Sequence, residues 1–230
     1  MPPTTRLEFR IVVLLFGALL GLQFVWLVSS ELSRTSIVQL PGNATAAAAA
    51  AKERDRAALA AAIGLIRGEL WAQSAFTYAD LFFSQIDDPD VARELGHAQD
   101  SLSRALNDEP SQSAVWLLRA ALGQRYPNLG FNVSEAIKMS FYTGPSEQEL
   151  IPLRLRLAVS SGTMGDAEIF PLVRRDLRLL LALKQQAVIM KAYEAASPTQ
   201  KRFIERTLSE VDPAAAESLK RGAQKWSLPD

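Results

Sequence analysis

The chain has 230 residues, of which 48% are hydrophobic, and it carries 25 basic and 25 acidic residues. The formal charge of zero argues against nucleic-acid binding, because such binding depends on a surplus of Lys and Arg. The sequence contains no cysteine, which excludes disulfides, thiolate metal sites and thiol nucleophiles.

Residues 11–28 predict a membrane-spanning helix, because Gln23 is the only polar residue in this run. At ~1.5 Å per residue the run is ~27 Å long, close to the ~30 Å hydrocarbon core of a bilayer. Trp26 lies near the far end, where aromatic rings favour the membrane interface. We assign residues 11–30 as the anchor in the lipid bilayer. Its characteristic residues are Ile11, Leu15, Gly17, Gly21 and Trp26.

A cleaved signal peptide, with small residues before Glu31, is the alternative, but the apolar run exceeds the roughly 7 to 15 residues usual for one. An uncleaved anchor is therefore favoured. Arg6 and Arg10 precede the run, and only Arg34 follows it before Lys52. The positive-inside rule then places the N-terminus in the cytoplasm and the rest of the chain outside the inner membrane, in a periplasm.

Gly17 and Gly21 form a G-x-x-x-G arrangement, which predicts a homodimer through the anchor. We expect residues 1–10 to be a cytoplasmic N-terminus, and residues 31–50, which include Pro41 and Gly42, to be a linker. The remaining assignments are a helical domain over residues 51–226 and a tail over residues 227–230.

The alanine run at residues 46–51 predicts the start of a first long helix, because alanine has the best helix propensity. Apolar residues then recur on one helical face, which we expect to be buried. They are Leu59, Ile63, Ile66 and Leu70. Residues 71–83 are apolar nearly all round, so this part of the chain should form the centre of the core.

Charge is unevenly distributed in this region. Nine acidic and two basic residues lie between Glu69 and Glu109, whereas residues 52–67 carry four basic and two acidic ones. A solvated helix face is favoured over a site for a basic partner.

The carboxylates around Pro89 suggest calcium, but their spacing does not match an EF-hand, and Asp88 with Pro89 fits a helix start. These carboxylates are Asp87, Asp88 and Asp90. His97 has no second histidine near it and is interpreted as an exposed helix residue.

Residues 95–126 predict two antiparallel helices that pack through small residues. The order of these residues resembles the tetratricopeptide repeat, in which a small, large, small triplet and a proline precede a helix that opens with Trp. The matching residues are Ala98, Leu102, Ala105, Pro110, Trp116 and Ala120. The resemblance covers about one repeat and implies a helical-repeat protein with a single N-terminal membrane anchor.

Later helix starts are marked by capping residues and prolines. Capping boxes are predicted at Asn132 and Ser146, with Pro152 expected to kink or restart the second helix. An apolar run from residue 168 to residue 193 predicts one helix. Further starts are predicted at Ser197 with Pro198 and Gln200, and at Asp212 with Pro213 before an end near Gly222. No segment shows a strand's alternation. The predicted fold is all-α: a transmembrane helix followed by an irregular antiparallel helix-pair array.

A second, weaker resemblance lies in residues 137–158, which look like a stretch of small membrane-anchored alphaproteobacterial proteins linked to surface-polysaccharide synthesis or export. The residues that carry it are Lys138, Met139, Ser140, Tyr142, Thr143, Gly144 and Pro145. It implies an envelope protein and includes no catalytic motif.

No nucleophile, metal cluster, cofactor motif or phosphate loop is recognised, so we predict no catalytic or metal residue and expect function by contact with another envelope protein. The candidate partner surface consists of Arg119, Arg125, Tyr126, Arg154 and Arg156. These arginines would suit an acidic partner or an anionic polysaccharide, or they pair with the acidic helices between Glu69 and Glu109. A scaffold is favoured. The alternatives are a periplasmic chaperone or assembly factor and, less favoured, a glycan-acting enzyme that uses two carboxylates.

Overall fold

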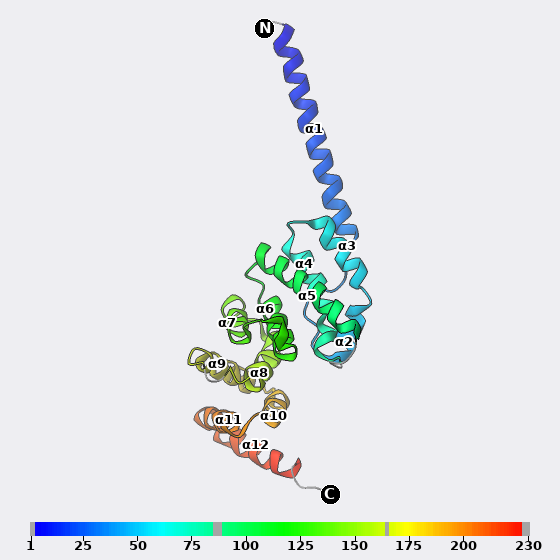
Figure 1. Cartoon of the computed structure of the whole chain (residues 1–230). Coiled ribbons are helices and arrows are strands. Elements are labelled where there is room, and N and C mark those ends of the chain that lie inside the picture. Colours follow the sequence, from blue (N-terminus) through cyan, green and yellow to red (C-terminus); the bar gives the residue numbers. More distant parts are fainter. Residues whose placement is uncertain (1–2, 85–88, 164–165, 227–230) are drawn as a thin grey trace. The chain divides into compact units, whose positions relative to one another are not determined.

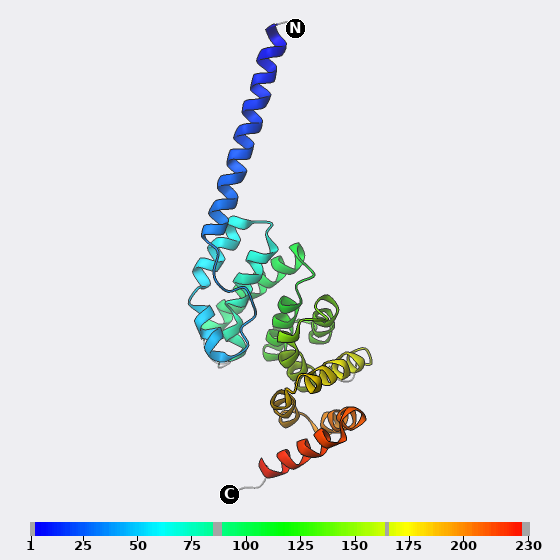
Figure 2. The same cartoon turned by 180° about the vertical axis from the view of Figure 1, so that it is seen from behind.

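The computed structural model describes residues 3–84, 89–163 and 166–226, with side chains for residues 8–84, 91–163 and 166–221. These described residues form helices joined by turns and contain no strand, so the predicted all-α class is confirmed for them. The chain divides into two compact units, Met1–Glu109 (unit 1) and Pro110–Asp230 (unit 2) (Figures 1 and 2). The domain boundaries expected from the sequence stay predictions.

Unit 1 begins with a long helix, α1, and continues with shorter ones (Figure 1). Its helices are α1 (Pro3–Leu32), α2 (Ala44–Ala51), α3 (Arg54–Gly64), α4 (Gly68–Phe76), the 3₁₀ turn η1 (Ala79–Phe82) and α5 (Pro89–Asp108). Helix α4 packs between α3 and α5, α2 packs on η1, and α1 contacts α3. The core of unit 1 lies around α4, where Leu70, Ala75 and Phe76 are buried. The predicted aromatic centre of the core is confirmed for Trp71, Phe76 and Tyr78, whereas Phe83, at its far end, is 37% exposed.

The first long helix expected from residue 46 onward is wrong, because the structure divides it into α2, α3 and α4. Helix α3 ends where the backbone of Leu65 takes a positive φ of 45°. A residue in this conformation cannot continue a right-handed helix. The chain then turns, with the amide of Arg67 donating to the carbonyl of Gly64.

The apolar stripe predicted to face the core is also wrong in part. Leu59 is 56% exposed and Ile66 is 77% exposed, although Leu70 is buried. The buried residues of α3 are instead small ones, namely Ala57, Ala60, Ala61 and Gly64. A Cβ atom on Gly64 would lie 2.4 Å from the Leu70 side chain. Close packing of α3 on α4 thus selects the small residues for the interior and leaves the large ones outside.

Unit 2 is built from helix pairs. Its helices are α6 (Ser113–Arg125), α7 (Val133–Thr143), α8 (Ile151–Ser160), α9 (Ile169–Ala182), α10 (Gln186–Glu194), α11 (Pro198–Val211) and α12 (Pro213–Trp226), with 3₁₀ turns η2 (Pro127–Leu129) and η3 (Gln148–Leu150). Consecutive helices pack as α6 with α7, α8 with α9, and α11 with α12. Helix α8 also contacts α6 and α10, and α10 contacts α12, while α9 contacts α11. The pairs therefore stack on one another (Figure 2).

Several predicted helix ends in unit 2 are confirmed. Asn132 accepts a hydrogen bond from the amide of Glu135, and α7 ends before Gly144. Ser197 and Gln200 form a complete capping box at α11. The Asp212 side chain accepts hydrogen bonds from two amides of the first turn of α12. Local capping chemistry was therefore a reliable guide to where these helices begin.

Three predictions in unit 2 are corrected. The last helix, expected to end near Gly222, continues to Trp226 as α12. Helix α8 has no capping box at Ser146: the 3₁₀ turn η3 precedes it, and Pro152 occupies its first turn. The run from residue 168 to residue 193 is not one helix, because α9 ends at Ala182 and α10 begins at Gln186. Lys184, between them, takes a positive φ of 57°. Here too, a single backbone reversal breaks a continuous apolar pattern.

The helix pair predicted over residues 95–126 corresponds to α5 and α6: the turn between them and the end of α6 agree with the prediction, whereas α5 begins earlier, at Pro89. The boundary between the two units falls in their turn, between Glu109 and Pro110. Within its own unit, α5 packs on α4, and α6 packs on α7. The tetratricopeptide-like arrangement therefore stays a prediction.

Candidate functional site

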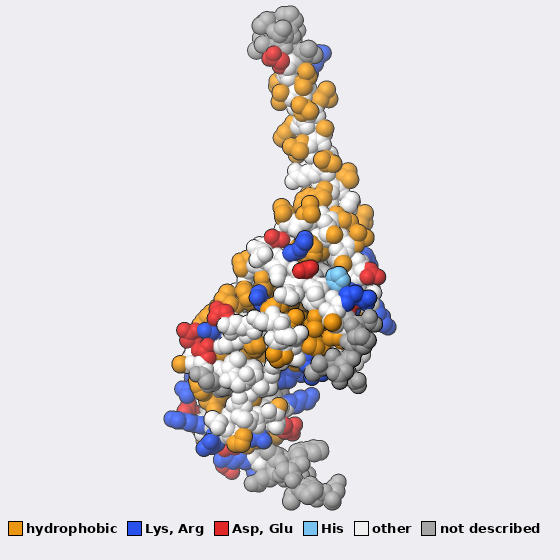
Figure 3. Space-filling view, in the orientation of Figure 1, with side chains coloured by type: hydrophobic (Ala, Val, Ile, Leu, Met, Phe, Trp, Pro, Cys, Tyr) orange, Lys and Arg blue, Asp and Glu red, His pale blue; other side chains and the backbone are white. Residues whose placement is uncertain are grey.

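Helix α1 is the first candidate feature, because its apolar side chains are exposed along most of its length (Figure 3). In the described part of the chain, the segment Glu8–Leu32 is the one stretch that is long and apolar enough to cross a membrane. A signal sequence near the N-terminus can meet the same criteria of length and hydropathy, so both interpretations of the sequence stand. A Cβ atom added to Gly17 or Gly21 would meet no atom within 4 Å, which leaves the face predicted to form a homodimer open.

The end of α1 is held against unit 1 by hydrogen bonds. The Trp26 indole Nε1 donates to the carbonyl of Ile63, at 2.6 Å, where α3 ends. One turn further along α1, Ser30 is fully buried and accepts a hydrogen bond of 2.8 Å from Nη1 of Arg67. The helix thus does not leave the domain through a free linker. It is attached along one face, at positions four residues apart.

An ion cluster surrounds this attachment. Arg67 pairs with Glu31 at 3.1 Å and with Glu69. Arg34 pairs with Glu31 at 3.0 Å and approaches Glu69 at 3.9 Å. The hydrogen bond to Glu69 is the main cause that raises the pKa of Arg67 above its ordinary value. We refer to the contacts of Trp26, Ser30 and Glu31 with Ile63, Arg67 and Glu69 as the anchor clamp.

A second ion cluster lies inside unit 1. Arg54 pairs with Asp80 at 2.7 Å and with Glu94 at 3.0 Å, and its guanidinium lies 4.5 Å from the ring centroid of Tyr78. It also donates to the carbonyl of Thr77. The basic segment at residues 52–67 therefore provides partners for part of the acidic run that follows it. The imbalance of charge seen in the sequence is partly an internal pairing.

The candidate partner surface predicted on the arginines of α6 and α8 is corrected at two positions, because Arg154 is fully buried and Tyr126 is 4% exposed. Arg119, Arg125 and Arg156 are partly exposed. Burial lowers the pKa of Arg119 and of Arg156. The Arg119 guanidinium lies 4.6 Å from the ring centroid of Phe131, a geometry of cation–π attraction.

Arg154 is the centre of a buried polar cluster in unit 2. Its Nε donates to Ser140 Oγ at 3.0 Å, and its Nη2 donates to the carbonyls of Ser140 and Gly144 at 2.6 and 2.9 Å. Asp176, on α9, is 1% exposed, and burial raises its pKa to about 6. Within the described residues, Nη1 of Arg154 and Oδ2 of Asp176 have no hydrogen-bond partner. No local pattern marks Asp176, which is one charged residue among several on α9.

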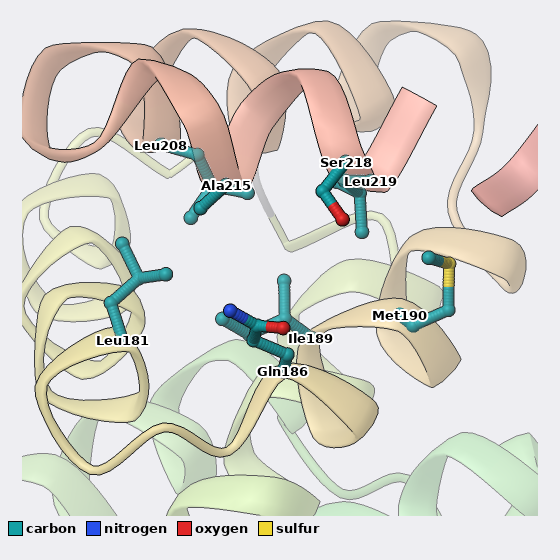
Figure 4. Close-up of a pocket in the computed structure, with 8 residues that line it drawn as sticks. All are labelled: Leu181, Gln186, Ile189, Met190, Leu208, Ala215, Ser218 and Leu219. Atoms are coloured by element: carbon teal, nitrogen blue, oxygen red, sulfur yellow. The ribbon is translucent and has the colours of Figure 1, made fainter. Parts of the chain in front are cut away.

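An apolar pocket lies among the last four helices of unit 2 (Figure 4). The residues that line it are Leu181 from α9, Gln186, Ile189 and Met190 from α10, Leu208 from α11, and Ala215, Ser218 and Leu219 from α12. Its volume of ≈ 50 Å³ is large enough for a few water-sized groups, such as the tip of one apolar side chain, and too small for a cofactor. Sequence reasoning missed this pocket, because its walls come from four helices.

The residues predicted for repeat packing are divided between the units. Ala98, Leu102 and Ala105 are buried on α5, and Ala120 is buried on α6. Trp116 is partly exposed, and its Nε1 donates to the carbonyl of Pro110 at 2.8 Å. The Trp and the Pro of the pattern are therefore in direct contact. That α5 and α6 form one repeat stays a prediction.

The His, Asp and Glu side chains that could bind a metal ion or take part in catalysis are considered next. Over residues 8–84, 91–163 and 166–221, whose side chains are described, no group of three or more His, Cys, Asp and Glu side chains is placed to hold a metal ion. His97 is exposed on α5, as expected. The helix start at Pro89 is confirmed, but Asp87, Asp88 and the side chain of Asp90 lie outside the described residues. No protein-family model, curated protein or solved structure matches this chain.

Proposed function

We propose that this protein is a single-pass, membrane-anchored, non-catalytic scaffold of the bacterial cell envelope, which binds another envelope protein. Its N-terminus lies in the cytoplasm and its helical units lie in the periplasm. The observation that carries the proposal is the anchor clamp, because it attaches α1 to unit 1 at Ile63 and Arg67 instead of leaving the helix on a free linker. A fixed attachment sets the orientation of unit 1 relative to the bilayer. Such an orientation serves a protein that presents a binding surface.

The stacked helix pairs of unit 2 support the binding part of this proposal. Helices α6, α8, α10 and α12 make successive contacts, and so do α9 and α11 in the neighbouring row. Stacked pairs of this kind create extended surfaces in helical-repeat proteins. The tetratricopeptide resemblance of the residues from Ala98 to Ala120 agrees with such an array. The small apolar pocket between α9 and α12 would accept the tip of one apolar side chain of a partner.

Anchoring is tested first. The full-length protein is expressed in a Gram-negative host, and its membranes are extracted at alkaline pH. We expect the protein to stay in the membrane with the intact mass of the full chain, and we expect protease added to spheroplasts to digest the helical units. A mature chain that begins near Glu31 would show that α1 is a signal peptide and would reject the anchor.

Binding is tested by photo-cross-linking in intact cells. A photoreactive phenylalanine analogue replaces Ser218, an exposed residue at the pocket, and in a matched variant it replaces Tyr142 on α7, which is 55% exposed. The proposal expects one envelope protein to be cross-linked from residue 218 in near-stoichiometric amount and not from residue 142. If both positions give the same diffuse products or none, the pocket is not a partner site.

A further inference from the structure

Unit 1 carries large apolar side chains on its surface close to α1. Leu59 on α3 is 56% exposed, and Leu65 and Ile66 in the turn between α3 and α4 are 63% and 77% exposed. Solvating three aliphatic side chains in one short segment is costly, at roughly 25 cal/mol per Å² of apolar surface. Neighbouring positions on α3, in contrast, bury small alanines. The large residues are therefore directed away from the core of unit 1.

The turn lies beside the last two turns of α1. Ile63, just before the turn, accepts the hydrogen bond of Trp26, and Arg67, just after it, donates to Ser30. Leu65 and Ile66 therefore occur between two contacts to α1 that are one helical turn, ~6 Å, apart along its axis. This is the level at which the apolar run of α1 ends and where an indole favours the membrane interface.

The backbone of the turn is unusual and firmly held. Leu65 has a φ of 45°, a conformation that glycine adopts far more readily than leucine. Its carbonyl accepts a hydrogen bond of 2.9 Å from the indole of Trp71, a core residue of α4. A strained residue that the surrounding structure holds in place is a reason to suspect a functional constraint. Here the constraint is that two adjacent aliphatic side chains are held outward.

We propose that the turn formed by Leu65 and Ile66, together with Leu59, inserts into the lipid leaflet beside α1, so that unit 1 is seated in the membrane surface as well as anchored through it. This proposal rests on the proposed membrane-spanning role of α1. We commit to lipid as the occupant, first, because the apolar turn continues the apolar surface of α1. Second, the charged groups of Arg67, Glu31 and Glu69 lie directly beside the turn, where they can contact the polar headgroups. Residues beyond this cluster remain outside the leaflet.

The absence of native cysteine makes the test direct, since any introduced cysteine is the only site for a thiol-reactive dye. The full chain is reconstituted in phosphatidylcholine vesicles with a fluorescent label at Leu65→Cys, Ile66→Cys or Val38→Cys. Val38 is the matched control: it is an aliphatic residue that is 63% exposed, and it lies in the loop next to α2. Helix α2 lies at the end of unit 1 away from α1 (Figures 1 and 2). A label at Leu20→Cys, within the apolar run of α1, reports on the anchor itself.

We expect lipid-attached nitroxides near the headgroups to quench the labels at residues 65 and 66 severalfold more strongly than the label at residue 38. Water-soluble iodide should show the opposite order. If residue 20 is quenched from the lipid but residues 65 and 66 respond like residue 38, the turn is not inserted and the anchor stands. Nitroxides attached deep in the acyl chains probe residue 20, and if they do not quench its label, the anchor itself is rejected. Disulfides between copies at residue 66, without lipid quenching, would instead assign the turn to a second copy.

Discussion

The charge clusters of unit 1 differ from the buried charges Arg154 and Asp176 of unit 2 in their exposure to solvent. In unit 1 the charged groups of the anchor clamp and of the Arg54 cluster are paired with one another and remain partly exposed. In unit 2, Arg154 and Asp176 are almost completely buried, and each has a polar atom without a partner in the described structure. Exposed pairs contribute little to stability, whereas a buried charge that loses its partner is costly. The two units should therefore respond differently to substitution and to pH.

The largest effect is expected from Arg154→Met. The substitution leaves the carbonyls of Ser140 and Gly144 without their donor, and it removes one of the two positive charges near Asp176, the other being Arg175 at 3.5 Å. We expect unit 2 to lose about 3 kcal/mol of its free energy of unfolding, measured by denaturant titration of the full chain in detergent. Arg178→Met is the control, because Arg178 is exposed on α9 and makes only a 4.0 Å contact with Glu210. An equal loss of unfolding free energy in both variants would show that burial of Arg154 does not make it more important for stability than the exposed Arg178.

The next effect is a pH dependence of unit 2. The pKa of Asp176 is about 6 in the folded chain, against an ordinary value of 3.8, so the folded state binds this proton more tightly than the unfolded state does. The contribution of Asp176 to stability is therefore fully present below pH 3.8. It is lost as the pH rises through about 6, and it should amount to on the order of 2 kcal/mol.

Asp176→Asn isolates this contribution. Because asparagine carries no charge at any pH, the variant should lack the decrease in stability that the parent chain shows between pH 4 and pH 6, and it should be more stable than the parent at pH 7. Thermal unfolding of both proteins across this range is the measurement. A variant that keeps the parent's pH profile would show that other groups cause it.

A smaller effect is expected in unit 1 from Arg67→Gln. The substitution removes the donor to Ser30 and the ion pairs with Glu31 and Glu69, which are 53% and 40% exposed. Since solvent screens these pairs, the loss of stability should be about 1 kcal/mol. Hydrogen exchange should nevertheless increase locally in residues 62–69 and at the end of α1. Lys52→Gln, which alters an exposed side chain at the end of α2, should leave this exchange unchanged.

The smallest effect on folding is expected from Gly17→Leu combined with Gly21→Leu. Both glycines have open space around them, so the larger side chains fit without changing unit 1. If the predicted homodimer forms through this face, the substitutions should separate it, because two helices can no longer approach closely there. Energy transfer between labelled copies in vesicles measures the association. Unchanged transfer would place the dimer contact elsewhere or exclude it.

The features that sequence could predict are those governed by neighbouring residues. The apolar run of α1 and the caps at Asn132, Ser197 and Asp212 depend on composition or on contacts within one helical turn. Each of these signals is complete in a short stretch of chain. The structure reproduces all of them.

The features that sequence could not predict depend on packing between segments. Leu65 and Lys184 adopt positive φ angles without being glycine, so nothing in the local pattern marks the helix breaks there. Arg154 follows an apolar residue on α8 and resembles any exposed arginine, until Ser140 and Gly144 of the preceding helix and turn are placed around it. A Cβ atom on Gly144 would lie 2.4 Å from Ser113 Oγ. The glycine therefore allows the turn after α7 to pack closely against the start of α6.

The anchor clamp has a consequence for rotation. Trp26 and Ser30 hold one face of α1 against unit 1, so the helix cannot turn about its own axis without carrying the unit with it. In a pair of copies joined through Gly17 and Gly21, the azimuth of each helix would also decide which side of unit 1 faces its neighbour. A small rotation of α1 about its own axis would then move the surface of unit 1 sideways, parallel to the bilayer.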